Sequence, residues 1–341
     1  MKKYNSEKIP DISVICLAYN AEKYIRKCLE SILSQKVSIS YEIIIHDDAS
    51  TDGTQKIIES YKEKFPDIIN PIYQEHNQYS KGVDIKKNFV LPLCKGKYIA
   101  FCEADDFWID QNKLQIQYEY MTTHSDVSLC VHNTIKRDLK GLKKDSLFNE
   151  WKDYHVMDSK DIFFGWKVHT SSYMVKKDVL TAMNYSKTYW FGDYILLTMA
   201  YNLGKVVCLP MIMSVYNYNN KNGAMYWVRH MDLDSHIEKI LDRKKYLKEF
   251  DEFTQKKYHD IILQKYIEID FQVIKETVDF DFFDLPYGKE VINRCRKVRK
   301  SVYFNRYLET LSLEGRIWSI LQYSGNPVLF WILKKYIKMK Q

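Results

Sequence analysis

The stretch Lys97-Tyr-Ile-Ala-Phe-Cys-Glu-Ala-Asp-Asp106 joins a short apolar run to three carboxylates. The run Lys97–Cys102 predicts a buried β-strand, because it is short, aromatic and aliphatic, and bounded by polar residues. Three carboxylates directly after a strand repel one another unless a cation holds them. The stretch therefore predicts a buried strand that ends in a polar site.

Similar units precede this stretch along the chain. Short apolar runs that predict strands alternate with segments of helical spacing, and Pro66 closes one of the helices. The predicted strands are Ile12–Leu17, Glu42–His46 and Asn70–Tyr73, and the predicted helices are Ala21–Gln35, Gln55–Phe65 and Asp84–Leu93. Alternation of this kind predicts an α/β fold with a mostly parallel sheet flanked by helices.

Polar clusters follow three of the predicted strands. They are Tyr19-Asn20, Asp47-Asp48 and Glu103–Asp106. Ligands of open parallel sheets bind beyond the carboxyl ends of the strands. We therefore expect the three clusters to converge on one site.

The carboxylates of these clusters suit two kinds of ligand. Glu103, Asp105 and Asp106 offer the oxygen atoms that Mg²⁺ and Mn²⁺ prefer, and such ions share their ligands with substrate phosphates. A carboxylate at Asp47 or Asp48 can accept the imide N–H of uracil or the hydroxyls of ribose. The alternative for Glu103–Asp106 is a solvated acidic turn. The alternative for Asp47-Asp48 is a helix cap or an Asx turn.

Three linked motifs carry a resemblance to a known family. Ser13-Val-Ile-Cys-Leu-Ala-Tyr-Asn20, Ile43-Ile-Ile-His-Asp-Asp-Ala-Ser-Thr-Asp-Gly-Thr54 and Lys95–Trp108 match the motifs of glycosyltransferase family 2 in order and spacing. The resemblance covers roughly residues 10–220. It implies a GT-A type fold, a nucleotide-diphosphate sugar donor, most often a UDP-sugar, a divalent Mn²⁺ or Mg²⁺, and inversion at the anomeric carbon.

The resemblance also assigns roles on the donor side. It implies that Ala18, Tyr19 and Asn20 line the nucleotide pocket, and that Asp47 and Asp48 hold the base and ribose.

The metal motif departs slightly from the family pattern. Glu103 and Asp105 match the family's D-x-D, with Asp105 as the principal metal ligand and Asp106 adding donor contacts. Glu103 replaces the usual Asp, and Ala104 stands where Gly is often found.

The family places an acceptor-side base after a second sheet region. Trp190-Phe-Gly-Asp-Tyr194 fits that position, so Asp193 is the candidate base, which would deprotonate an acceptor hydroxyl. The alternative is that Asp193 is the N-cap of a helix Tyr194–Leu203, and both roles are compatible.

Other polar residues have less defined roles. His169 resembles a residue of the family's acceptor-side loop, although a lone His is as often structural. Asn219 stands where many members carry a late His, and Lys221 is a second candidate for that place.

Composition restricts the class of protein. With 46% hydrophobic and 28% charged residues in a chain of 341, a sizeable core is expected without disulfides. The seven Cys show no CxxC pair, which predicts free buried thiols in a reducing cytoplasm rather than a zinc cluster. No signal-like apolar segment follows the N-terminus, and no uncharged stretch is long enough for a spanning helix.

The hydrophobic pattern of the sequence changes near residue 227, where short strand-like runs are followed by long segments of helical spacing. The sequence predicts a catalytic domain over residues 1–226 and a helical region over 227–341, which would contact the acceptor, a membrane or a second copy of the chain. Its expected helices are Met231–Phe250, Phe253–Val278 and Lys289–Leu313. The net charge of +7 is concentrated in this region.

The segment 327–340 combines an apolar block with Lys and aromatic residues. One interpretation is an interfacial helix on an anionic membrane, which would place the protein peripherally on the inner face of the cell membrane. The other is a terminal helix packed on its own domain or on a partner subunit, as in a homo-oligomer. Nucleic acid is not expected as a partner, because no known binding signature is present.

The function predicted is transfer of a sugar to a hydroxyl of a cell-surface glycan, a lipid-linked glycan or a glycoprotein. The alternatives are a nucleotidyltransferase of related sheet topology and a non-catalytic binding relative. Nucleotidyltransferases commonly carry a Gly-rich N-terminal loop, which Leu17–Asn20 lacks. A non-catalytic relative would lack the metal site or the base, whereas this chain has Glu103, Asp105 and Asp193.

Overall fold

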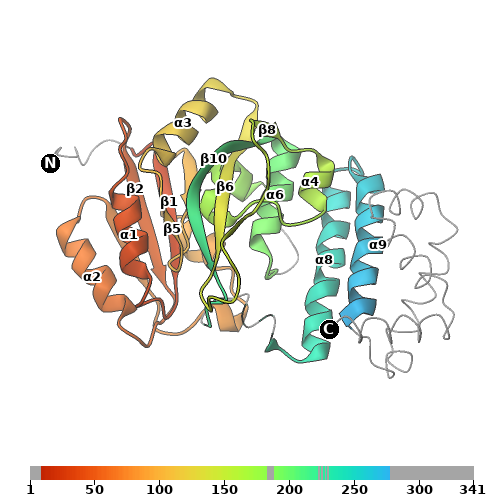
Figure 1. Ribbon diagram of the computed structural model, residues 1–341, viewed down its shortest axis with the longest axis horizontal. Helices are drawn as coiled ribbons and strands as arrows, with labels where there is room; N and C mark the ends of the chain where they lie inside the picture. Colours follow the sequence, from red (N-terminus) through yellow and green to blue (C-terminus); the bar gives the residue numbers. More distant parts are fainter. Residues whose placement is uncertain are drawn as a thin grey trace, which may run out of the picture. The chain divides into compact units, whose positions relative to one another are not determined.

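A mixed ten-stranded sheet is the centre of the N-terminal part in the computed structural model (Figure 1). The structure describes residues 9–182, 188–221 and 230–276, together with 223, 226 and 228. Contacts divide the chain into two compact units, Met1–His230 and Met231–Gln341. This boundary is close to the predicted division after residue 226, and the roles assigned to the two parts remain predictions.

One half of the sheet is parallel, as the alternating sequence pattern predicts. Its strands run in the order β3-β2-β1-β4. They are β1 (Ile12–Ala18), β2 (Tyr41–Asp47), β3 (Ile69–Tyr73) and β4 (Tyr98–Phe101). Because β1 and β2 are in register up to Ala18 and Asp47, the polar residues after both strands start at the same sheet edge.

The other half of the sheet departs from the parallel arrangement. The strand β9 (Met174–Lys176) runs antiparallel to both β4 and β6 (Val127–Asp138), and β6 then pairs in parallel with β10 (Lys205–Tyr218). Shorter strands complete it: β5 (Phe107–Trp108), β7 (Ser146–Leu147) and β8 (His155–Val156). The sheet is thus mixed rather than mostly parallel. An apolar run in the sequence indicates that a strand is buried, but it does not indicate the direction of that strand.

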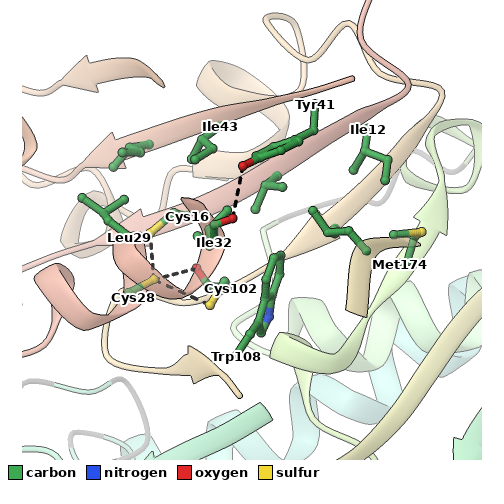
Figure 2. Close-up of a cluster of buried hydrophobic side chains, with 14 of the residues drawn as sticks. Ile12, Cys16, Cys28, Leu29, Ile32, Tyr41, Ile43, Cys102, Trp108 and Met174 are labelled. Atoms are coloured by element: carbon green, nitrogen blue, oxygen red, sulfur yellow. Dashed lines mark hydrogen bonds between the residues drawn. The ribbon is translucent and has the colours of Figure 1, made fainter. Parts of the chain in front are cut away.

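Helices α1 (Ile25–Leu33) and α2 (Thr54–Lys64) lie beside the parallel half (Figure 1). Cys28, Leu29 and Ile32 of α1 pack with the alternate residues of β1 in one buried cluster (Figure 2). Such burial of an amphipathic face stabilises the βαβ unit by the hydrophobic effect. The expected helix Asp84–Leu93 is reduced to a π-helical turn, η2 (Lys86–Val90).

Further helices and helical turns complete the first unit. They are η1 (Tyr79–Lys81), α3 (Lys113–Thr123), α4 (Ser159–Phe163), η3 (Thr170–Ser172), α5 (Lys177–Thr181) and α6 (Gly192–Leu203).

The six cysteines in the described part of the chain are buried free thiols, as expected. Three of them meet in the core: the Sγ of Cys28 lies 3.9 Å from that of Cys16 and 3.6 Å from that of Cys102 (Figure 2). Burial raises the pKa of the Cys102 thiol, which keeps it protonated and inert.

The second unit contains α8 (Leu233–Phe253) and α9 (His259–Glu276), which pack against each other. Lys244 of α8 forms an ion pair with Asp270 of α9. The two helices correspond to the first two expected in this region. The expected helix Lys289–Leu313 and the segment 327–340 lie outside the described residues.

Within the portion of the chain that the structure describes, no helix has both the length and the apolar character needed to cross a bilayer.

Candidate active site

The acidic loop 103–106 connects β4 to β5 and is fixed to the neighbouring strand by its main chain. The N–H of Ala104 donates to the carbonyl of Leu17 at 3.1 Å, and the N–H of Cys102 donates to that of Ile15 at 3.0 Å. Ala104 is itself buried. The loop therefore starts at the carboxyl end of β1, beside the residues that follow β1 and β2.

Asp106 is the internal anchor of this loop. Its side chain is 1% exposed and accepts hydrogen bonds from the main-chain N–H of Asn217 at 3.0 Å and from the Ser171 hydroxyl at 2.6 Å. Burial raises the pKa of Asp106 well above its usual range, and the charges of Asp105 and Glu103 raise it further. The loop is thereby tied to β10 and η3. The donor contact expected of Asp106 remains a prediction.

Glu103 and Asp105 differ from Asp106 in that both remain partly exposed. Asp105 Oδ2 accepts a hydrogen bond from the Asn220 amide at 2.9 Å, and burial raises the Asp105 pKa. Burial also raises the pKa of Glu103 to about 7, and the charges of Asp105 and Asp193 act in the same direction. The carboxylates of Glu103 and Asp105 therefore form an acidic pair that a ligand can reach.

This donor set fits a divalent cation shared with a substrate. No group of three or more His, Cys, Asp and Glu suited to a metal occurs among the residues described. Mg²⁺, however, is commonly held by one or two carboxylates plus substrate phosphates. The oxygens of Glu103 and Asp105 would supply such a pair, since both side chains are partly exposed and lie on one loop.

Asp47 and Asp48, at and just after the end of β2, are both buried and order the loops around them. Asp47 accepts hydrogen bonds from the Ser50 hydroxyl at 2.5 Å and the Ser50 N–H at 3.2 Å. Asp48 accepts from the main-chain N–H groups of Gln78 and Tyr79 at 2.7 and 3.0 Å. Asp47 is therefore bound within its own loop, although the N–H lies three residues on and not two as in an Asx turn. Contact of either carboxylate with a base or ribose remains a prediction.

The residues after β1 present a mixed surface to the same edge. Tyr19 is 40% exposed, whereas Ala18 is buried and its carbonyl accepts the N–H of Asp48. Asn20 has a left-handed φ of 47°, and its side-chain oxygen accepts the N–H of Thr51 at 2.8 Å. The first two polar clusters thus interlock by hydrogen bonds.

Asp193 lies in the first turn of α6 and not at its N-cap, because the helix begins at Gly192. Its Oδ1 accepts the N–H of Tyr194 at 2.8 Å. The charge of Asp193 raises the pKa of Glu103, which places the candidate base near the acidic loop. The structure thus brings Asp193, Glu103 and Asp105 into one region.

Lys86 is a cation of this region that the sequence did not single out. A Cβ built on Gly192 would lie 3.3 Å from Lys86 Nζ, so the ammonium group reaches the start of α6. Its charge lowers the pKa of Glu103, opposing the effect of burial. Lys86 also lines a pocket with Leu17, Trp190 and Ile195. In the sequence it is one of two adjacent Lys on an expected helix, a pattern typical of a solvated face.

His169 is buried and bound by the protein's own main chain. It is 5% exposed, and its Nδ1 accepts the N–H of Ser171 at 3.2 Å at the start of η3. Burial lowers the pKa of His169 to about 3, so the ring is neutral at physiological pH. Its Nδ1 lies 3.5 Å from Asp106 Oδ2, but a neutral ring accepting at that nitrogen forms no ion pair there.

Asn219 binds to the end of β6. Its side chain donates to Asp138 at 2.7 Å, and its φ of 65° turns the chain after β10. The next residue, Asn220, makes the contact with Asp105 instead. Lys221 is exposed. The sequence missed Asn217 and Asn220 because a run of Asn in a loop is typical of turns.

Comparisons with known proteins bear on the family and the fold. Residues 13–182 match the family model described as Glycosyl transferase family 2. The chain is 40% identical over 116 residues to the putative teichuronic acid biosynthesis glycosyltransferase TuaG of Bacillus subtilis, covering 34% of this chain and 44% of TuaG. It is 39% identical over 112 residues to the Escherichia coli UDP-Glc:alpha-D-GlcNAc-diphosphoundecaprenol beta-1,3-glucosyltransferase WfaP, covering 33% and 41%. The chain thus matches less than half the length of each relative.

The fold resembles that of solved glycosyltransferases. S. aureus TarS 1-349, in a crystal structure with UDP-GlcNAc, superposes with a TM-score of 0.66 over 97% of this chain and 92% of TarS 1-349, at 15% identity. At this identity the likeness concerns the fold alone, and it confirms the predicted α/β, GT-A type architecture.

Proposed function

This chain belongs to glycosyltransferase family 2, and from its site we propose that it transfers a sugar, with inversion, from a UDP-sugar to a hydroxyl of a glycan acceptor. The observation that carries the proposal is the acidic loop at the carboxyl end of β1, where Glu103 and Asp105 are partly exposed and the charge of Asp193 acts on Glu103. TarS was solved with UDP-GlcNAc, and WfaP is named for UDP-Glc, which supports UDP as the nucleotide.

The proposed mechanism assigns a proton transfer to Asp193. Its carboxylate takes the proton of the acceptor hydroxyl, the resulting oxygen forms the new bond to the anomeric carbon, and the bond to the UDP oxygen breaks. One in-line displacement inverts that carbon. A Mn²⁺ or Mg²⁺ held by Glu103 and Asp105 would neutralise charge on the diphosphate leaving group.

The remaining site residues position the donor in this proposal. Tyr19, whose side chain is exposed, would line the nucleotide pocket together with Ala18 and Asn20. Asp47 and Asp48 would contact the base and ribose, either directly or through the loops that they order.

The names of two relatives support a class of acceptor. TuaG is named for teichuronic acid biosynthesis, and WfaP for a diphosphoundecaprenol-linked sugar. We therefore place the acceptor among cell-surface glycans, with a lipid-linked glycan favoured over a glycoprotein. Such an acceptor also motivates a cytoplasmic enzyme that contacts the inner face of the membrane through residues 327–340.

The test of the donor site is a thermal-shift measurement with UDP, GDP, dTDP and CDP, each with Mn²⁺ and with EDTA. A ligand that binds only the native state raises the melting temperature. We expect a Mn²⁺-dependent shift with UDP that is lost in Asp105→Asn and kept in the control Asp145→Asn, whose side chain is exposed and paired with Arg137. Absence of any nucleotide shift in the wild type would favour the non-catalytic relative.

A further inference from the structure

Trp166 is an exposed aromatic side chain held beside the candidate site. It lies on the loop between α4 and η3, is 40% exposed, and is flanked by Gly165, whose φ of 87° turns the chain. Two residues later Val168 is 1% exposed, which fixes the loop to the core. An exposed indole on an anchored loop presents apolar surface without much freedom to move.

Three aromatic rings fix the orientation of the indole. Phe148 meets Trp166 at a centroid distance of 5.0 Å and an interplanar angle of 88°, and Tyr216 meets it at 5.6 Å and 75°. His169 lies 5.7 Å away at 58°. Edge-to-face contacts of this kind stabilise a ring in one orientation. Since all three are tilted, none stacks in parallel on the indole.

The rings that hold Trp166 lie next to the acidic loop. His169 stacks on Tyr216 at 4.2 Å and lies 3.5 Å from Asp106 through Nδ1. The residue after Tyr216, Asn217, donates its N–H to Asp106. One layer of contacts therefore connects the exposed indole to the strand end where the transfer is proposed.

We propose that Trp166 is a stacking platform for a sugar ring of the acceptor glycan, held by Phe148 and Tyr216 next to the acidic loop. This inference rests on the proposed function and adds an acceptor subsite to it. One face of a pyranose exposes mainly C–H groups, which pack on an aromatic ring by the hydrophobic effect and dispersion. A ring that is already oriented loses little conformational entropy when the sugar binds.

A second exposed aromatic residue provides the control. Tyr154 is 57% exposed and stacks on Tyr120 of α3 at 5.6 Å and 19°. It resembles Trp166 in exposure and aromatic support, but the contacts that hold it lead to α3 and not to Asp106. A general preference of sugars for exposed rings would therefore affect both residues, whereas an acceptor subsite affects Trp166.

The experiment measures binding of methyl α- and β-glycosides of glucose, galactose, mannose and N-acetylglucosamine by saturation-transfer NMR, with and without UDP and Mn²⁺. We expect at least one glycoside to bind the wild type, and Trp166→Ala and Trp166→Leu to weaken it by about tenfold. Trp166→Phe and Tyr154→Ala should bind it within about twofold of the wild type. The melting temperature of each variant reports folding.

The outcomes separate this inference from the proposed function. Equal glycoside binding by wild type and Trp166→Ala, or no glycoside binding by the wild type, overturns the platform. Equal loss in Tyr154→Ala also overturns it. The shift of the melting temperature by UDP and Mn²⁺, measured on the same samples, reports the donor site independently of either result.

Discussion

The carboxylates of the acidic loop show that neighbouring residues of one type take different roles. Asp106 has both oxygens bound by protein donors and is buried, whereas Glu103 and Asp105 remain partly exposed. An oxygen that already accepts strong hydrogen bonds inside the protein has little to offer a ligand. Asp106 therefore holds the loop in place, and Glu103 and Asp105 are the carboxylates proposed as metal ligands, while a donor contact of Asp106 remains a prediction.

Asp193→Asn is expected to reduce transfer while preserving donor binding. The amide keeps an oxygen that can accept the N–H of Tyr194, so the start of α6 should be unchanged, but it can no longer accept a proton. Loss of a general base typically costs about 10²–10⁴-fold in rate. The measurement is UDP release with acceptor, together with the thermal shift by UDP and Mn²⁺.

Asp178→Asn is the matched control for this variant, since Asp178 is an exposed acid in the first turn of α5. Transfer by Asp178→Asn should equal that of the wild type. Turnover at the wild-type rate in Asp193→Asn would remove Asp193 from the mechanism.

Lys113 is a fully buried cation that should make stability depend on pH. Its Nζ donates to Gln117 at 2.7 Å and lies 4.1 Å from the centre of the Trp108 ring. Burial lowers the Lys113 pKa to about 7 from an ordinary 10.5, so between these values the unfolded chain binds more protons than the folded one. Stability contributed by this group therefore rises as pH increases from about 7 toward 10.5.

Lys113→Met should reduce the change in melting temperature between pH 6.5 and pH 9, measured in EDTA. The exposed Lys56 of α2 gives the control, and Lys56→Met should keep the wild-type slope. The change of the melting temperature with pH is the decisive quantity, because the loss of the hydrogen bond to Gln117 lowers the melting temperature at every pH. An unchanged slope in Lys113→Met would mean that Lys113 does not titrate in this range.

At the scale of elements, the buried strands and the helices beside them agree with their hydrophobic periodicity. Ile12–Leu17 and Glu42–His46 were expected as strands, and β1 and β2 extend them by one residue or two. The segment 84–93 differs, because its apolar residues support only the turn η2. A short apolar pattern does not distinguish a full helix from a single turn.

Gly96 fixes the approach of β4 to β1. A Cβ at this position would lie 2.4 Å from the main-chain nitrogen of Ser13 and 2.6 Å from the carbonyl carbon of Ile12. Gly96→Ala should therefore displace the strand pair and destabilise the protein by about 1–3 kcal/mol, the usual cost of overpacking. Denaturant unfolding measures this change.

Gly141 allows the steric effect to be separated from backbone strain. It has a left-handed φ of 68° and open space where a Cβ would lie. Gly141→Ala should cost about 1 kcal/mol from strain alone. A smaller loss in Gly96→Ala than in Gly141→Ala would contradict the close approach of the two strands.

At the scale of the whole molecule, the chain divides into two compact units, and the candidate site belongs to the first. The proposed membrane contact concerns residues 327–340, which lie outside the described part. Their chemistry, an apolar block with four Lys, favours vesicles that contain anionic lipid.

Co-sedimentation with phosphatidylglycerol vesicles tests this contact. The full chain should partition onto them at least about fivefold more than a truncation after Gly325, as expected if even one Lys contributes. Replacing Lys334, Lys335, Lys338 and Lys340 by Gln should abolish the preference for anionic over phosphatidylcholine vesicles. Equal binding by the full chain and the truncation would show that this segment is not the membrane contact.

The sequence by itself determined the α/β class, the parallel strand pairs and the clustering of Asp47, Glu103 and Asp105 at one sheet edge. These follow from local causes, because apolar periodicity sets burial and short βα connections set strand direction. The candidate base Asp193 came from a family motif, and the structure brings it close to Glu103.

Only the tertiary structure decided which polar atoms remain available. It joined Asp106 to Ser171 and Asn217, placed Lys86 against Gly192, and connected Trp166 to the acidic loop through Tyr216 and the adjacent Asn217. It also turned β9 against β4, so the sheet is mixed. These contacts join residues far apart in the chain, and burial, hydrogen bonding and strand direction at such distances depend on packing that no local pattern records.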